Sequence, residues 1–99
     1  MSKADIIKIL KKAYPVLSRR FNVKRIALFG SLAKGTQTDS SDVDLMIEFN
    51  GPIGLKFVEL GEFLEGLLGT RVDILTRAGI NAIRVKRAAK AIERNLEYV

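Results

Sequence analysis

The sequence contains neither cysteine nor histidine. Without cysteine there are no disulfides, no thiolate metal sites and no cysteine nucleophile. Without histidine, the usual zinc-hydrolase and Ser-His-Asp sites lack their ligand or their base. Any catalysis by this chain must therefore depend on carboxylates, hydroxyl groups, basic side chains and a bound metal ion.

Long apolar runs are also missing. No stretch approaches the roughly 20 apolar residues that cross a bilayer. In the N-terminal segment 2–17, Lys and Asp interrupt the apolar residues, and no small-residue cleavage site follows. This pattern argues against a signal peptide. We therefore expect a cytoplasmic protein with no membrane span.

The chain has 99 residues, of which 47% are hydrophobic, and we expect a single domain over residues 1–99. Its formal net charge of +6 favours anionic partners such as nucleotides, nucleic acid, an acidic protein or a membrane surface. Charge alone does not choose among these, and solubility explains it equally well. So short a chain has little room for a domain that holds an acceptor, which points to a partner protein or a homo-oligomer.

Helical and extended patterns alternate along the chain. Ser2 and Asp5 form a plausible capping box that opens a helix, Pro15 should kink or split this helix, and Asn22 ends it. Residues 96–99 are expected to be a tail. The order αβαβαβ predicts an α/β (α+β) fold with a small mixed three-stranded sheet flanked by helices. The expected strands are 24–29, 43–49 and 71–76, and the later helices are a short one opened by Ser31, then 54–68 and 80–95.

Three carboxylates stand out. Asp42 and Asp44 open the second expected strand, where residues two apart point to the same face. Two adjacent carboxylates repel each other unless a cation lies between them, and Mg²⁺ prefers oxygen ligands. Asp73 in the third expected strand joins them if the two strands are neighbours. Three carboxylates on one sheet can hold two metal ions about 4 Å apart, as phosphoryl and nucleotidyl transfer requires.

A turn upstream of the acids has the features of a phosphate site. Gly30-Ser31 follows the first expected strand and precedes the short helix. Exposed backbone N–H groups at a helix N-terminus favour phosphate, glycine permits close approach, and Ser31 can donate its hydroxyl. The sequence thus offers an anion site beside a cation site, and a Mg²⁺-triphosphate needs both.

Each feature alone has a plainer explanation. Asp42 and Asp44 could be loop-end caps, and Asp73 could be a strand residue in a salt bridge. Gly30-Ser31 by itself is a weaker signal still. Their combination, with the turn ten residues before the acids, is much more specific than any one of them.

The combination resembles the signature of the DNA polymerase β-like nucleotidyltransferase superfamily. Within that superfamily the chain is similar to the minimal nucleotidyltransferases of prokaryotes, and the similarity covers nearly the whole chain. The residues that carry it are Leu28-Phe29-Gly30-Ser31-Leu32-Ala33-Lys34-Gly35, Ser41-Asp42-Val43-Asp44-Leu45 and Leu68-Gly69-Thr70-Arg71-Val72-Asp73-Ile74-Leu75.

The resemblance implies a site and a reaction. Asp42 and Asp44 would bind two Mg²⁺ ions, and Asp73 would complete the catalytic metal site and help to activate the acceptor hydroxyl. The substrate would be ATP, with pyrophosphate as the leaving group. Gly30 and Ser31 would hold the triphosphate, and Lys34 occupies a basic position common in the family.

The resemblance also implies a partner. Many members are encoded beside a HEPN-domain ribonuclease toxin and act as its antitoxin, and some adenylylate a tyrosine of that toxin. One departure concerns Leu32, where related sequences often carry Arg or another polar residue. Losing that phosphate contact would weaken triphosphate binding.

Two other functions remain open. The chain could neutralise a toxin by binding alone, with vestigial nucleotide chemistry. It could also be a basic nucleic-acid-binding protein, but the last expected helix lacks aromatic residues that stack on bases. That helix carries a basic face which solvation explains more simply, formed by Arg84, Lys86, Arg87, Lys90 and Arg94.

Overall fold

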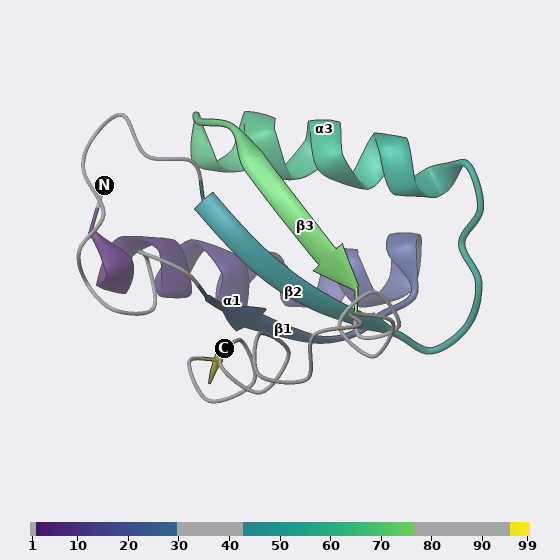
Figure 1. The fold of residues 1–99 in the computed structure, drawn as a ribbon, viewed down its shortest axis with the longest axis horizontal. Helices are drawn as coiled ribbons and strands as arrows, with labels where there is room; N and C mark the ends of the chain where they lie inside the picture. The colour runs from purple at the N-terminus through teal and green to yellow at the C-terminus, as the bar shows by residue number, and fades with distance from the viewer. Residues whose placement is uncertain (1, 30–42, 77–95) are drawn as a thin grey trace, which may run out of the picture.

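The computed structural model describes residues 2–29, 43–76 and 96–99 (Figure 1). Two expected helices, the short one opened by Ser31 and the one at 80–95, lie outside the described residues, as does the expected polar loop 36–41 between the short helix and Asp42. No helix in the described ranges is long and apolar enough to cross a membrane.

The first helix, α1 (Lys3–Phe21), begins and ends as its caps predict. Ser2 is the N-cap, and its capping box with Asp5 is complete, since each side chain accepts a hydrogen bond from the other residue's backbone N–H. Asn22 ends the helix in the left-handed conformation at φ 57°, with its N–H donating to the Leu17 carbonyl.

Pro15 lies inside α1, which continues as one helix to Phe21. Of the predicted kink or split at this proline, the split is therefore wrong. Proline removes the hydrogen bond to the carbonyl four residues earlier, which is that of Lys11. Pro15 and Lys11 are both exposed, so water can hydrate the carbonyl that loses its partner.

Within the described ranges the sheet has four strands in the order β3-β2-β1-β4. Strand β1 (Val23–Leu28) pairs antiparallel with β2 (Val43–Phe49), and β2 pairs parallel with β3 (Val72–Thr76). The helix α3 (Lys56–Leu68) connects these parallel strands and ends at Gly69, the predicted C-cap, with φ 70°. The predicted mixed sheet and the second strand's bounds are confirmed.

The fourth strand, β4 (Glu97–Tyr98), corrects the predicted tail and the predicted count of three strands. It pairs antiparallel with Ala27 and Leu28, and the Val99 N–H donates to the Ile26 carbonyl. A salt bridge of 2.7 Å between Lys3 and Glu97 joins it to the start of α1. The residues around 97 were expected to be a tail because a two-residue strand has no periodicity to detect.

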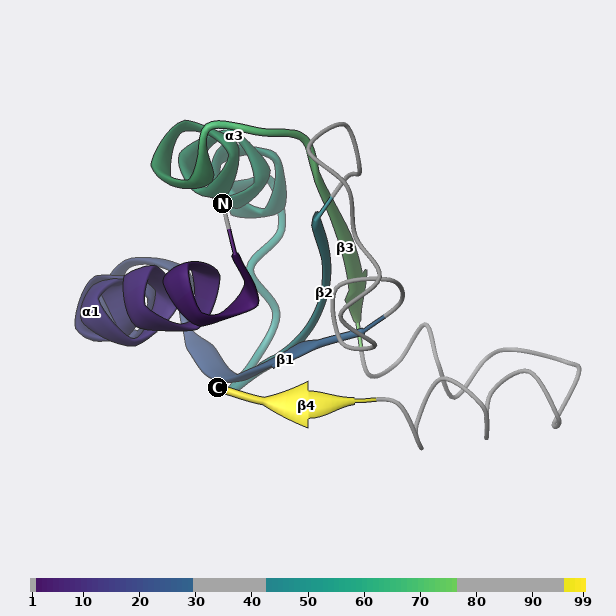
Figure 2. The same ribbon diagram turned by 90° about the vertical axis from the view of Figure 1, so that its left-hand side faces the viewer.

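Both helices cover one face of the sheet, as Figure 2 shows. Their buried side chains pack against the strand residues that point toward them. In this layer the ring centres of Phe21 and Phe63 are 5.6 Å apart. Ala27 and Met46 are buried on the opposite face, with Leu75 and Leu96 beside them. The sheet therefore has an apolar layer on each side, as predicted for its first strand. The buried residues of the helix side are Ile6, Leu10, Leu17, Phe21, Val23, Ile26, Leu28, Val43, Leu45, Ile47, Leu60, Leu64 and Leu68.

Candidate active site at the edge of the sheet

Two of the predicted acids meet on neighbouring strands. Asp44 in β2 is the register partner of Asp73 in β3. Directly paired residues on adjacent strands point to the same face, and neighbouring strands lie about 4.8 Å apart. Asp44 is half-buried and Asp73 is exposed. The sheet thus places two carboxylates side by side, one of them open to solvent.

The acids lie on the face of the sheet away from α1 and α3. Strand side chains alternate between faces, and Val43 and Leu45 belong to the layer beneath the helices. Asp44 between them must point the other way, as does Met46, which packs on Leu75 in the opposite layer. Of the described helices, neither α1 nor α3 covers the acid face.

Backbone hydrogen bonds fix the start of β2, where Asp44 lies. The Phe29 N–H donates to the Asp44 carbonyl at 3.1 Å, which joins the end of β1 to this point. On the other side, the Val43 N–H donates to the Arg71 carbonyl at 2.9 Å. The end of β1 and the starts of β2 and β3 therefore form one edge, on the left side of the sheet in Figure 1.

Glu65 of α3 fixes the start of β3. Its carboxylate accepts a hydrogen bond from the Val72 N–H at 3.1 Å, and its backbone carbonyl accepts one from Gly69 at 2.8 Å. Val72 directly precedes Asp73, so one helical residue holds both ends of the turn that leads to this acid. We predicted only a solvated helix face there; Glu65 is exposed but also makes this contact.

The other predicted site residues lie outside the described residues. These are Gly30, Ser31, Lys34 and Asp42, and Leu32 lies there too. Gly30 follows Phe29 directly, and Asp42 precedes Val43, so both positions are adjacent in the chain to the edge that carries Asp44. In residues 2–29, 43–76 and 96–99, no three acidic side chains come together as a metal site. The described part of the site therefore consists of the two carboxylates of Asp44 and Asp73.

Further along the acid face lies a charged cluster that the sequence did not indicate. Arg25 forms a salt bridge with Glu48, and its guanidinium lies 5.1 Å from the centre of the Tyr98 ring. Arg25 and Glu48 are register partners on β1 and β2. The Arg25 guanidinium thus contacts both the Glu48 carboxylate and the Tyr98 ring. The second contact links β4 to β1.

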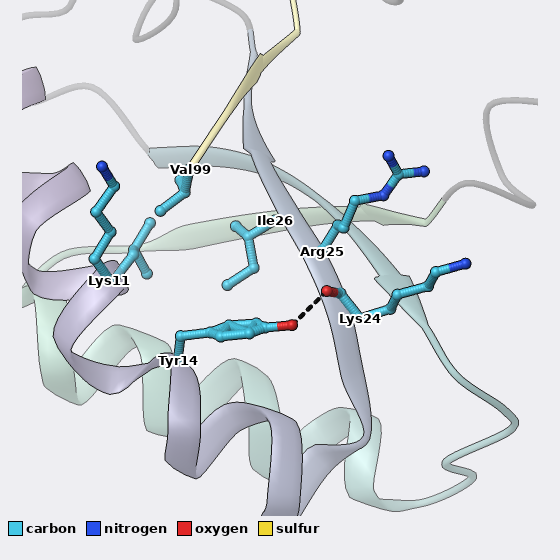
Figure 3. Close-up of a pocket in the computed structure, with 7 residues that line it drawn as sticks. Lys11, Tyr14, Lys24, Arg25, Ile26 and Val99 are labelled. Carbon is cyan, nitrogen blue, oxygen red and sulfur yellow. Dashed lines mark hydrogen bonds between the residues drawn. The ribbon is translucent and has the colours of Figure 1, made fainter.

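A separate pocket of about 360 Å³ lies between α1 and β1 (Figure 3). The Tyr14 hydroxyl donates to the Lys24 carbonyl at 2.6 Å, and the Lys24 and Arg25 side chains extend away from the Tyr14 ring. Its lining residues Ile26 and Val99 belong to the helix-side core. The pocket is therefore on the opposite face from the acids, and Tyr14 serves there to attach α1 to β1.

Comparison with known proteins decides the family. The model of the nucleotidyltransferase domain matches residues 5–99. The chain belongs to the nucleotidyltransferase family. This nucleotidyltransferase is 38% identical to the protein adenylyltransferase MntA of Thermococcus cleftensis, over 96% of the chain and 93% of that protein. It is 44% identical to a Methanocaldococcus jannaschii protein provisionally named a protein adenylyltransferase, over 97% and 96% of the two chains.

Solved structures agree with this family. A structure provisionally described as a minimal nucleotidyltransferase superposes with a TM-score of 0.74 at 31% identity, covering 98% of this nucleotidyltransferase and 95% of that chain. A toxin–antitoxin structure with AMP-PNP superposes with a TM-score of 0.63, covering 99% and 72% of the two chains. Its identity is 22%, so that likeness concerns the fold alone.

Proposed function

We propose that this nucleotidyltransferase transfers AMP from ATP to a hydroxyl group of a partner protein, with Mg²⁺ as cofactor. The acceptor in this proposal is a tyrosine of a HEPN-type ribonuclease toxin, so that the protein acts as an antitoxin. The observation that carries the chemistry is the register pairing of Asp44 with Asp73 on the open face of the sheet. The protein acceptor is supported by relatives named as protein adenylyltransferases.

The acids fit the proposed cofactor. Adjacent carboxylates repel each other when ionised, and a divalent cation between them removes that cost. Their oxygen atoms are the donors that Mg²⁺ prefers. We assign Asp44, Asp73 and Asp42 as ligands of two Mg²⁺ ions. When bound, these ions neutralise charge on the phosphates and on the attacking and leaving oxygens.

The protein groups have distinct roles in the proposed reaction. Gly30 and Ser31 hold the triphosphate through backbone N–H groups and a hydroxyl, and Lys34 adds a positive charge. The acceptor oxygen forms a bond to the α-phosphorus of ATP, and the bond from that phosphorus to the bridging oxygen of the β-phosphate breaks. Pyrophosphate leaves, AMP remains on the acceptor, and the hydroxyl proton passes to the Asp73 carboxylate.

The open face explains why a protein can be the acceptor. Helices α1 and α3 cover the opposite face, and Asp73 is exposed. In the described part of the chain no element crosses over Asp73, so a hydroxyl on a second protein can approach it. A toxin partner accords with toxin–antitoxin structures of the same fold, one of them with AMP-PNP.

The test is incubation of the protein with α-labelled ATP, Mg²⁺ and a HEPN-type ribonuclease toxin as the proposed acceptor. We expect label on the toxin, with loss of its ribonuclease activity. Asp44→Asn and Asp73→Asn should each abolish the label while the circular dichroism spectrum is unchanged. Glu59→Gln, on the exposed face of α3, is the matched control and should keep full labelling. Neutralisation of the toxin by both Asp variants would instead establish a module that acts by binding alone.

A further inference from the structure

A basic pocket lies at the end of the molecule opposite the acids. It has a volume of about 340 Å³ and is lined by Arg19, Arg20 and Lys56 among apolar groups that include Pro52 and Ile53. Among the described residues, no acidic side chain lines it. In the part of the chain that the structure describes, neither Arg19 nor Lys56 forms an ion pair. The described lining of the pocket is therefore positively charged, with the exposed acids Glu59 and Glu62 further along α3.

Arg20 is held in place at this pocket. Its guanidinium lies 5.0 Å from the centre of the Phe21 ring and 5.7 Å from that of Phe63. A guanidinium packed on two aromatic rings has lost much of its rotamer freedom before any ligand arrives. Such an arginine is prepared to form paired hydrogen bonds with a carboxylate at a lower entropic cost.

Exposed apolar side chains flank Lys56, one of the residues that line the basic pocket. Leu55 is 90% exposed and Val58 is 62% exposed, although most large apolar residues of this chain are buried or half-buried. Leu55 is the N-cap of α3 and Val58 lies in its first turn, with Lys56 between them in the chain. The Val58 N–H donates to the Leu55 carbonyl. We call these five residues, Arg19, Arg20, Leu55, Lys56 and Val58, the basic end surface.

This surface is separate from the candidate active site. The Asn50 N–H donates to the Asn22 carbonyl, and Phe49 and Phe57 lie 6.5 Å apart, so the surface adjoins the end of β2. Asp44, near the start of β2, lies five residues before Phe49, which corresponds to roughly 17 Å along the strand. An occupant of the basic end surface would leave the acid face open.

The chain itself offers a poor occupant. Residues 77–95 contain six basic residues and one acidic residue, Glu93, so they would be repelled by the pocket. A second copy meets the same repulsion where two such pockets face each other. The mixture of fixed cations and exposed aliphatic groups instead complements a protein segment that carries both acidic and apolar side chains.

We infer that the basic end surface is a docking site for a segment of a partner protein that carries both acidic and apolar side chains. A carboxylate enters the pocket and pairs with Arg20, flanked by Arg19 and Lys56. Apolar side chains of the same segment cover Leu55 and Val58. This goes beyond the proposed transfer reaction, because the surface binds its partner at the end of the molecule remote from the acids and without nucleotide.

Nucleic acid and anionic membranes fit this surface less well. Stacking of bases requires open aromatic rings, but Phe57 packs edge-on against Phe49 and is only 37% exposed. Membrane binding by an amphipathic helix needs a broad apolar face, whereas α3 exposes acids on the turns that follow Val58, at Glu59 and Glu62. Binding to nucleic acid and binding to an anionic membrane are therefore the competing outcomes in the test.

The test is an NMR titration of the full chain, without ATP or metal, with a synthetic peptide of Glu and Leu in helical spacing. We expect the methyl signals of Leu55 and Val58 and the side-chain signals of Arg20 to shift together. The same peptide with Gln in place of Glu should bind about tenfold more weakly. Because no nucleotide is present, failure here leaves the transfer reaction intact, and failure of transfer leaves this result intact.

Charge-reversal variants separate the surface from overall charge. Arg19→Glu with Lys56→Glu should weaken the Glu–Leu peptide about tenfold. Lys11→Glu with Lys12→Glu changes the net charge equally on another part of α1 and should leave the affinity unchanged. Leu55→Asn, at an almost fully exposed position, should weaken binding without affecting the fold. Equal losses in the two charge variants, or shifts at these signals with poly(U) or anionic vesicles but not with the peptide, would overturn the inference.

Discussion

Asp44 and Asp73 are register partners on two parallel strands, so their carboxylates project side by side from the face of the sheet that the helices leave open. The parallel pairing arises because α3 carries the chain back across the helix side between β2 and β3. Antiparallel strands joined by a tight turn would bring the start of one strand beside the end of the next. The long connection is thus what aligns the two acids.

Replacement of Asp73 should separate function from stability. Like charges directly opposite on neighbouring strands destabilise a sheet by roughly 0.2–1 kcal/mol. Asp73→Asn should therefore raise the free energy of unfolding of the metal-free protein by about that amount, and it should lower transfer by about 10²–10⁴-fold through loss of the proton acceptor. Urea denaturation without metal and a labelling assay measure the two effects. A large loss of stability would mean that Asp73 is a structural residue.

The hydrogen bond from Val72 to Glu65 should matter for the position of Asp73. Glu65→Ala leaves the Val72 N–H to solvent and should cost about 1 kcal/mol of stability. It should also lower kcat more than it raises the KM for ATP, because the strand that carries Asp73 is held less firmly. Glu65→Gln keeps an acceptor and should restore both quantities. Faster amide exchange at Val72 in the Ala variant alone is the structural readout.

The core between the helices and the sheet should be sensitive to cavities. Leu64 is fully buried on α3, and its replacement by Ala should cost about 2–5 kcal/mol. Thr76→Ser, on half-buried β3, removes a single methyl group and should cost less. The free energies of unfolding from urea titration compare the two variants. If Leu64→Ala lowered the free energy of unfolding no more than Thr76→Ser does, Leu64 would not be part of the packed core.

The capping box should make stability depend on pH in acid. Hydrogen bonds from the Ser2 backbone N–H and then its hydroxyl lower the pKa of Asp5. A carboxylate with a lowered pKa in the folded state contributes stability above its unfolded pKa, and that contribution disappears as the pH falls through the folded pKa. The denaturation midpoint should therefore fall less steeply in acid for Asp5→Asn than for the parent chain. Parallel curves would exclude this contribution.

Local patterns were sufficient to predict most of the described fold. The capping box at Ser2, the left-handed cap at Gly69 and the bounds of β2 depend on residues close together in the sequence, and all are confirmed. Strand β4 was missed because its two residues gain their structure only from Ala27 and Leu28, about seventy positions away. Pro15 was judged by its own propensity, but tertiary packing of α1 outweighs it.

The candidate site shows the same division. Alternation along a strand predicted that Asp42 and Asp44 share a face, but the sequence could only suggest that Asp73 joins them. Their pairing depends on strand order, which no local pattern specifies. The contact of Glu65 with Val72 and the cluster of Arg25, Glu48 and Tyr98 link separate elements, so neither could be read from spacing. The roles of Asp42, Gly30, Ser31 and Lys34 stay predictions.

The most direct test of the shared metal site is a titration of the ¹⁵N-labelled protein with Mn²⁺, whose oxygen-ligand preference resembles that of Mg²⁺. A paramagnetic ion held by both carboxylates should broaden the amide signals of Asp44 and Asp73 at the lowest Mn²⁺ concentrations, and excess Mg²⁺ should restore them. The signals of Glu59 and Glu62 on α3, on the other side of the sheet, should broaden only later. Equal broadening at all exposed carboxylates would contradict a metal site between these two strands.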